Sequence, residues 1–217
     1  MTFDTSAGTA RRRPLSDVEN RILDAVLDCS RRWGFDRMTV DDIVELSGVS
    51  RATVYRMFPG GKDVLFEALR VRELDLFFSA LASELADADD LTEVLVRSLV
   101  TATVHLRADD HLALMLASEP GQTLTDLTVD GLPRIINMAS ETLAPWVASH
   151  LATDEARLLI DVLVRLTISY FLAPSEYLDL AEPGQARAFL APVLSALGQR
   201  PADPAPTDQI PTDRSTR

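Results

Sequence analysis

Residues 39–62 read TVDDIVELSGVSRATVYRMFPGGK, and this stretch decides the fold of the N-terminal part of the chain. Thr39 is a good helix N-cap with Asp42 three residues on as its acidic partner, and the apolar residues that follow predict a short helix. Gly48 can take the left-handed conformation that a tight turn requires, and Ser50 caps a second short helix. Two short helices joined by a tight turn are typical of a helix-turn-helix motif.

The second helix of the motif carries polar and basic side chains on its outward faces. Val54 and Phe58 share the inward face at a spacing of four. Arginine can bond the edge of guanine in the major groove, and hydroxyl groups and tyrosine can bond phosphate. The predicted DNA contacts are Arg51, Thr53, Tyr55 and Arg56, together with the two caps Thr39 and Ser50. The alternative is an ordinary helical corner with solvated charges.

The same stretch resembles the N-terminal domain of the TetR family of transcriptional regulators, whose pattern has the form T-V-x-x-I-A-x-x-A-G-V-S-x-G-T-L-Y-x-H-F-x-S-K. The match runs in one register through Thr39, Val40, Ile43, Gly48, Val49, Ser50, Thr53, Tyr55, Phe58 and Lys62. The resemblance implies a repressor that binds double-stranded DNA as a homodimer. The operator is then expected to be a pseudo-palindrome with half-sites about one helical turn or slightly more apart.

Three positions depart from the family pattern. Ala52 stands where glycine is usual, Met57 stands where histidine is frequent, and one extra residue precedes Lys62. The resemblance implies that Lys62 contacts phosphate, and the extra residue changes the spacing on which this contact depends.

The composition predicts a helical protein. The chain has 217 residues, of which 47% are hydrophobic and 6% aromatic, and it contains 9 glycines. Ala, Leu and Val dominate the apolar residues, which favours helices over strands. The predicted fold is therefore all-α, with a three-helix helix-turn-helix head and a helical body for ligand binding and dimerisation.

The net charge of −12 is unusual for a DNA-binding protein, but its distribution explains it. Residues 1–62 carry 10 Lys and Arg against 9 Asp and Glu, whereas the remaining residues carry 11 against 24. A near-neutral head with clustered arginines can still neutralise phosphates locally. The acidic body is expected to discourage wrong contacts.

The chain is predicted to have four parts. They are a flexible basic arm over residues 1–14, the DNA-binding domain over 15–62, the ligand-binding and dimerisation domain over 63–198, and a proline-rich disordered tail over 199–217. The arginines at 11–13 read equally well as an arm that contacts phosphate or a minor groove and as a solvated tail.

The single cysteine, Cys29, excludes a disulfide framework and suits a reducing compartment. The N-terminus lacks the apolar segment of a secretory signal, and no run of 18 uncharged apolar residues occurs. We therefore expect a cytoplasmic protein without a membrane partner.

The head is expected to begin with a supporting helix. Ser16 and Glu19 form a capping box at its start, and Gly34 ends it. Trp33 and Phe35 are expected to pack beneath the motif. After the motif, the apolar spacing predicts a long helix, and the resemblance implies that this helix connects the head to the body.

The remaining pattern predicts body helices over 91–106, 110–118, 133–151, 154–172 and 185–197, with an irregular segment or short helix before the third and a kink or restart at Pro192 in the last. Residues 158–172 are apolar on nearly every face, so a second copy of the chain is expected to cover one side. The resemblance implies that the last two helices form the dimer interface. The predicted interface residues are Leu159, Leu163, Phe189 and Val193.

Large and flexible apolar side chains on the presumed inward faces of the body suggest a cavity for a small apolar effector. The predicted lining residues are Phe78, Thr103, Met115, Met138, Thr142, Trp146, Leu166 and Tyr170, of which the hydroxyl-bearing ones can bond a polar end. The alternative for each of them is a filled helical core.

No cofactor, metal site or catalytic site is predicted. His105, His111 and His150 lack the spacing and the cysteines of a metal site, and no nucleophile or phosphate-binding motif stands on a credible scaffold. An enzyme is therefore not expected. Two alternatives stay open, namely a small-molecule carrier that has lost DNA binding and a helical enzyme that uses His105 or His111.

Overall fold

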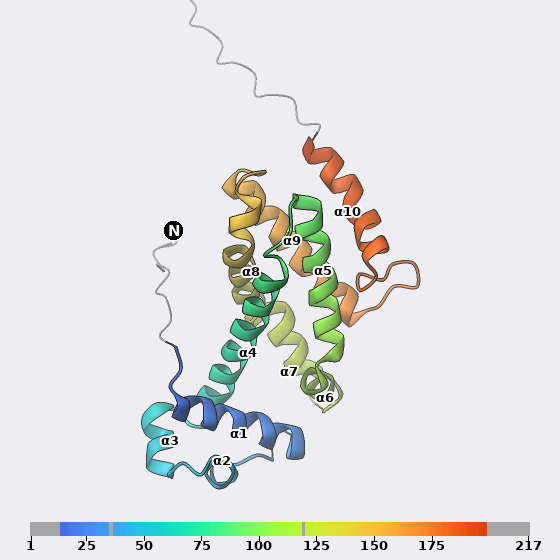
Figure 1. The fold of residues 1–217 in the computed structure, drawn as a ribbon. Coiled ribbons are helices and arrows are strands. Elements are labelled where there is room, and N and C mark those ends of the chain that lie inside the picture. Colours follow the sequence, from blue (N-terminus) through green and yellow to red (C-terminus); the bar gives the residue numbers. More distant parts are fainter. Residues whose placement is uncertain (1–13, 35–36, 119, 199–217) are drawn as a thin grey trace, which may run out of the picture.

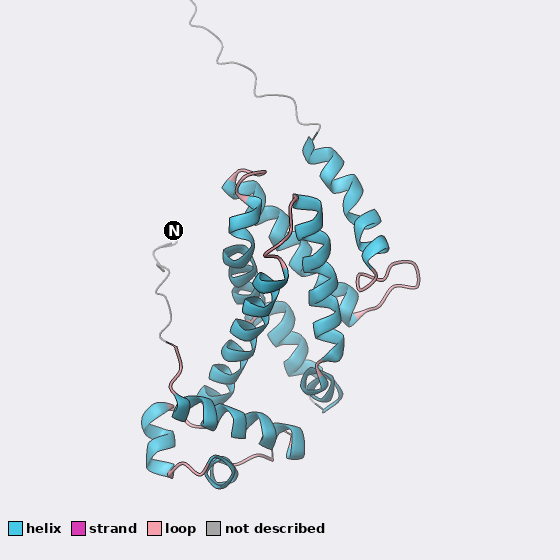
Figure 2. Cartoon of the chain, in the orientation of Figure 1, coloured by secondary structure: helices cyan, strands magenta, loops and turns pink. Residues whose placement is uncertain are grey.

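The computed structural model describes residues 14–34, 37–118 and 120–198, and every regular element in these ranges is a helix (Figure 2). The elements in chain order are α1 (Asp17–Trp33), α2 (Val40–Ser47), α3 (Arg51–Met57), α4 (Lys62–Glu84), α5 (Leu91–Ala108), α6 (Asp110–Ser118), α7 (Pro120–Thr125), the π-helix η1 (Asp126–Asp130), α8 (Leu132–Val147), α9 (Thr153–Leu172) and α10 (Pro183–Gly198). Residues 1–13 of the predicted arm and the tail 199–217 lie outside the described residues.

Helices α1, α2 and α3 form a head at one end of the molecule, and α4 runs from this head into the body (Figure 1). The predicted capping boxes are present, because Ser16 exchanges hydrogen bonds with Glu19 at the start of α1 and Thr39 does so with Asp42 at the start of α2. These caps satisfy backbone N–H groups that a helix start leaves without partners.

The core of the head continues into the first turns of α4. Leu65, Phe66 and Leu69 of α4 are buried together with apolar residues of α1, α2 and α3, among them Ile43 and Val54. Each such buried side chain stabilises the fold by about 1.5–3 kcal/mol. In addition, the buried Arg72 donates hydrogen bonds to the backbone oxygen of Asn20 and to Asp24 in α1. The N-terminal half of α4 is therefore packed as part of the head.

One prediction about the head was wrong. Trp33 was expected to pack beneath the motif, but it is 44% exposed at the end of α1. Met38, which directly precedes the cap Thr39, is buried in the head core. Trp33 stands in the last turn of α1, and the head core next to α2 includes Met38 instead. Phe35 lies outside the described residues.

The body is a helical assembly in which α8 packs on α4 and α9, and α5 packs on α9 and α10 (Figure 1). Between residues 119 and 132 the chain forms α7 and η1, where the sequence had predicted an irregular segment or a short helix. The last helix, α10, runs through Pro192 as one helix. In the described ranges, no helix combines the length and the apolar character needed to cross a bilayer.

Candidate DNA-binding surface and ligand cavity

The turn between α2 and α3 has the geometry that the sequence predicted. Gly48 has φ 64° and ψ 18°, the left-handed conformation, and its N–H donates to the Val44 backbone oxygen at 3.1 Å. Ser50 then caps α3, because its hydroxyl accepts a hydrogen bond from the Thr53 N–H at 3.3 Å. The C-cap at Gly48 and the N-cap at Ser50 therefore fix the direction of α3 relative to α2.

Helix α3 buries one face and presents the other to solvent. Val54 is 1% exposed and packs in the head core, whereas Arg51, Tyr55 and Arg56 are exposed. Thr53 is half-buried, and its hydroxyl lies 3.0 Å from that of Ser50. The structure thus brings the predicted DNA contacts of α3 and the cap Ser50 onto one exposed region, with Thr39 also exposed at the start of α2.

The Arg51 side chain has a defined position at the start of α3. Its Nη1 donates a hydrogen bond to Oδ1 of Asp41 at 2.6 Å, and its Cζ lies 5.8 Å from the centre of the Tyr55 ring. A hydrogen bond with the Tyr55 side chain and the nearby Asp41 carboxylate both raise the pKa of Arg51 above its ordinary value. Asp41, which no feature of the sequence motif had singled out, is therefore part of this surface.

The extra residue before Lys62 is absorbed by a turn with two glycines in positive φ. Gly60 has φ 127° and Gly61 has φ 73°. A Cβ on Gly60 would lie 2.5 Å from Cγ2 of Val64, so this position excludes a side chain on steric grounds as well. Lys62 is half-buried as the first residue of α4, one turn beyond the end of α3. Its contact with phosphate stays a prediction.

A cavity of about 580 Å³ lies in the body, within the size range of small-molecule sites. It is lined from α4, α5, α6, α7, η1, α8 and α9, and most of its lining is apolar, including Phe78, Leu81, Leu99, Leu143, Ile160 and Leu163. Because so many elements converge on it, the cavity is a feature of the assembled body and of no single motif.

One part of the cavity wall carries paired charges. Arg70 on α4 contacts Glu67 at 3.5 Å and pairs with Asp126 of η1, and Arg134 of α8 pairs with Glu67. All four side chains line the cavity. Since each of these four charges has an opposite charge beside it, the four side chains together add no net charge to the wall. The other ionic residues of the lining, Glu73, Asp109 and Asp130, are acidic.

Of the predicted ligand contacts, Phe78 and Met115 line the cavity. The other six lie elsewhere. The Thr103 hydroxyl is buried and donates to the Leu99 backbone oxygen at 2.7 Å. Tyr170 stacks edge-on against Phe189 at 6.2 Å. The remaining four, which are all half-buried and outside the lining, are Met138, Thr142, Trp146 and Leu166.

The cavity lining also contains residues that the sequence pattern did not indicate for this role. His105 lines it and packs against Phe77 with 4.7 Å between the ring centres. Glu67, Arg70, Asp126 and Arg134 had no motif that could have identified them. His150 is exposed after α8, far along the chain from α5. Within the described part of the chain, no three His, Cys, Asp or Glu side chains are grouped so as to hold a metal ion.

The predicted dimer residues divide between the core and the surface. Leu159 and Leu163 of α9 are 8% and 7% exposed and pack inside the body, and Leu163 also lines the cavity. Phe189 is half-buried, and Val193 on α10 is 38% exposed. On α9 the exposed apolar residues are instead Leu158 at 66% and Val162 at 42%. The exposed apolar face of α9, with Leu158 and Val162, is therefore adjacent to the face with Leu159 and Leu163 that was predicted to form the dimer interface.

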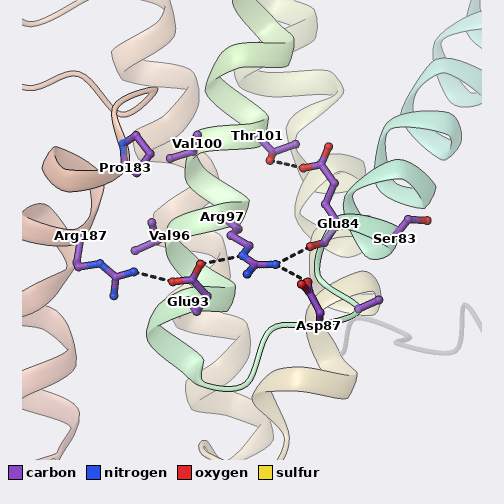
Figure 3. A pocket seen from close by; sticks show the side chains of 11 residues that line it. Ser83, Glu84, Asp87, Glu93, Val96, Arg97, Val100, Thr101, Pro183 and Arg187 are labelled. Carbon is purple, nitrogen blue, oxygen red and sulfur yellow. Dashed lines mark hydrogen bonds and ion pairs between the residues drawn. The ribbon is translucent and has the colours of Figure 1, made fainter.

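Figure 3 shows a second, more open pocket of about 750 Å³ between the end of α4, α5 and α10. Arg97 stands at its centre and donates to Glu93 Oε1 at 2.8 Å, to Asp87 Oδ1 at 2.5 Å and to the Glu84 backbone oxygen at 3.1 Å. Arg187 of α10 donates to Glu93 Oε2 at 2.6 Å. These bonds hold the pKa of Glu93 below its ordinary value. The network joins α4 and α10 to α5.

The architecture defines a class of protein, an all-α protein with a helix-turn-helix head and a helical body that contains a cavity. Residues 22–69 match the family model described as bacterial regulatory proteins, tetR family. The N-terminal part of the chain therefore carries a domain of the TetR family, as its sequence pattern predicted.

Three known proteins are similar to longer parts of the chain. An uncharacterized HTH-type transcriptional regulator of Mycobacterium tuberculosis is 35% identical over 104 residues, which are 48% of this chain and 52% of that protein. The match thus spans about half the length of that relative. The transcriptional regulator AlkX of Mycobacterium tuberculosis is 28% identical over 187 residues, covering 81% of this chain and 87% of that protein.

Among solved structures, the TetR family repressor AlkX from Dietzia sp. superposes with a TM-score of 0.62 at 18% identity, covering 87% of this chain and 100% of that chain. At this identity the likeness shows the fold, which confirms the predicted all-α class. The similar proteins are described as regulators, in agreement with the prediction that the chain is not an enzyme.

Proposed function

We propose that the protein is a DNA-binding transcriptional repressor that acts as a homodimer. It leaves its operator when a small apolar molecule fills the cavity. The observation that carries this proposal is the exposed face of α3, where Arg51, Tyr55 and Arg56 stand on a TetR-family head. Basic and hydroxyl-bearing side chains on the second helix of such a motif suit the major groove.

Two heads are needed to read a pseudo-palindromic operator, because each α3 reaches only one half-site. The exposed Leu158 and Val162 of α9 and the exposed Val193 of α10 support a homodimer. Covering apolar side chains of this size with a second copy of the chain removes them from water and stabilises the dimer.

The effector is proposed to be apolar and uncharged. The cavity lining is mostly apolar, and four of its ionic side chains are paired with one another. Its other ionic side chains, Glu73, Asp109 and Asp130, are acidic, which disfavours an anionic ligand. The Dietzia repressor with the same fold is implicated in the biodegradation of n-alkanes. Linear hydrocarbons and their neutral derivatives are therefore the first compounds to test.

The cavity shares part of its wall with the head. Phe66 and Leu69 line the cavity and belong to the head core, and Met115 of α6 lines the cavity and packs against that core. A molecule in the cavity therefore contacts side chains on which the position of the head depends. To weaken DNA binding a hundredfold, the effector needs about 2.7 kcal/mol of preference for the conformer that does not fit the operator.

The test begins with selection of the genomic fragments that the purified full chain retains, followed by titration of a selected fragment at several salt concentrations. The expected result is a sequence-dependent complex whose affinity falls steeply with salt. Compounds are then added to look for release. If the chain retains no fragment above background, the proposal is wrong. A small-molecule carrier would then be favoured, because the cavity supports ligand binding without DNA binding.

A further inference from the structure

The ion pair between Asp41 and Arg51 joins the first turn of α2 to the first turn of α3 across the helix-turn-helix corner. The two side chains are 72% and 59% exposed, and their closest atoms lie 2.6 Å apart. An exposed ion pair of this kind contributes little to the stability of a fold. The capping of α2 does not depend on Asp41 either, because Thr39 and Asp42 form the capping box.

The pair has a different consequence for the guanidinium group. Asp41 engages Nη1 from one side, and the Tyr55 ring lies 5.8 Å from Cζ. A guanidinium group is planar, and its fork of N–H donors matches guanine O6 and N7 only when its plane is correctly turned. Two contacts that fix this plane before DNA arrives lower the entropic cost of making the base contact.

The charge of Asp41 acts in the same direction. A lone arginine is drawn to any phosphate, and this attraction is independent of sequence. The carboxylate beside Arg51 cancels its net charge toward the backbone and repels phosphate, whereas hydrogen bonding to a base edge depends on the pattern of donors and acceptors. The pair thus weakens the contact that carries no sequence information.

We propose that Asp41 is a positioning residue that determines specificity, by holding Arg51 for a base edge and away from phosphate. This inference rests on the proposed function, since it requires that α3 reads DNA. It assigns to α2 a part in the choice of operator, although α2 is not the helix that enters the groove.

The test compares Asp41→Asn with the wild type on the selected operator and on a fragment of unrelated sequence. Asn keeps the shape of the side chain and removes its charge. We expect binding to the unrelated fragment to strengthen, its salt dependence to steepen by about 0.9 in slope for one added phosphate contact, and the ratio of specific to non-specific affinity to fall by about 5- to 100-fold.

Glu45→Gln is the matched control. Glu45 is exposed on α2 one turn beyond Asp41, so the same charge is lost from the same helix at a position that does not pair with Arg51. This control is expected to keep the ratio of affinities. In an Arg51→Ala background, Asp41→Asn is expected to have no further effect on the ratio, because the group that it positions is gone.

If the wild type is selective and Asp41→Asn has the same ratio of specific to non-specific affinity, this inference is wrong. The proposed function is unaffected by that result. The inference also fails if Glu45→Gln lowers the ratio as much as Asp41→Asn does, since the effect would then be one of charge at any site on α2. A wild type that binds every sequence equally would overturn the proposed function, and this inference with it.

Discussion

Arg51 is the side chain on which the proposed base readout depends most, since it opens α3 and is held in place by Asp41 and Tyr55. Arg51→Ala is expected to weaken operator binding by about 1–3 kcal/mol and to relax the preference at one base position in each half-site. Titrations on operators altered at single positions measure both effects. Equal losses on all sequences would assign Arg51 to phosphate.

Cys29 is fully buried in the head core, and burial raises the pKa of its thiol to about 11. The thiolate is the reactive form, so the native protein is expected to resist thiol reagents at neutral pH and to react at once when unfolded. The raised pKa also means that folding favours the neutral thiol. The stability that comes from keeping the Cys29 thiol neutral is complete below pH 9 and is lost as the pH rises toward 11.

The pH dependence is measured by denaturant unfolding between pH 8 and pH 11, with Cys29→Ala as the reference that lacks a titrating thiol. The wild type is expected to lose more stability than this variant over the alkaline part of the range. Rapid labelling of the native protein at pH 7 would mean that the head opens far more often than its packing implies.

At the scale of elements, the turn between α3 and α4 depends on Gly60. Replacement by alanine places a Cβ against Val64 at a backbone conformation that side chains rarely adopt. Gly60→Ala is expected to destabilise the head by more than about 1 kcal/mol and to misplace α3. Thermal unfolding and operator binding report the two effects.

Gly121 provides the control for this substitution. It lies in α7, where an added Cβ meets nothing within 4 Å, so Gly121→Ala is expected to be neutral or slightly stabilising. If Gly60→Ala were equally harmless, the turn would have another conformation available, and the extra residue before Lys62 would not constrain the head.

The proposed dimer is best tested on α9 at Leu158. Leu158→Glu places a charge in the face that a second copy would cover, and it is expected to cost several kcal/mol of association. Sedimentation measures the loss of dimer, and operator binding is expected to fall with it. Leu76→Glu is the control, because Leu76 is 58% exposed on α4. If Leu158→Glu stays dimeric, the interface lies on another face.

The sequence predicted the features of the fold that depend on neighbours in the chain. Capping at Ser16 and Thr39 and the left-handed Gly48 are interactions within a few residues, so the pattern of residue types identifies them. The faces of α9 could not be assigned in this way. Since nearly all of its residues are apolar, only the packing of α5 and α8 shows that Leu159 is buried and Leu158 exposed.

For the cavity too, the sequence identified only features that depend on neighbouring residues in the chain. Phe78 and Met115 could be selected because large apolar side chains at helical spacing point inward. The hydroxyl of Thr103 also points inward, but it is satisfied by its own helix. The pairing of Arg70 with Asp126 joins residues 56 positions apart, and no local pattern encodes it.

At the scale of the whole molecule, Met115 offers the most direct test of coupling, because it touches both the cavity and the head core. Met115→Ala is expected to leave operator binding intact without effector and to reduce the effect of an effector on it by about 0.5–2 kcal/mol. The measurement is operator affinity with and without a compound that releases the wild type.

Met138→Ala serves as the comparison for this variant. Met138 packs on the α4, α8 and α9 side of the body and does not line the cavity. Met138→Ala is expected to lower the free energy of unfolding without changing the effect of the compound on DNA binding. If both variants lower that effect equally, a general loosening of the body explains the result better than a contact through Met115.

The bonds that Arg97 and Thr101 make to Glu84 tie the far end of α4 to α5. They give that helix a fixed pivot at the end opposite the head. At a rise of 1.5 Å per residue, the 23 residues of α4 span about 35 Å. A rotation of only about 5° around the pivot therefore carries Lys62 through about 3 Å, close to the rise of one base pair. A tilt of about 5° in α4 is therefore enough to move the head by a distance comparable to one base-pair step.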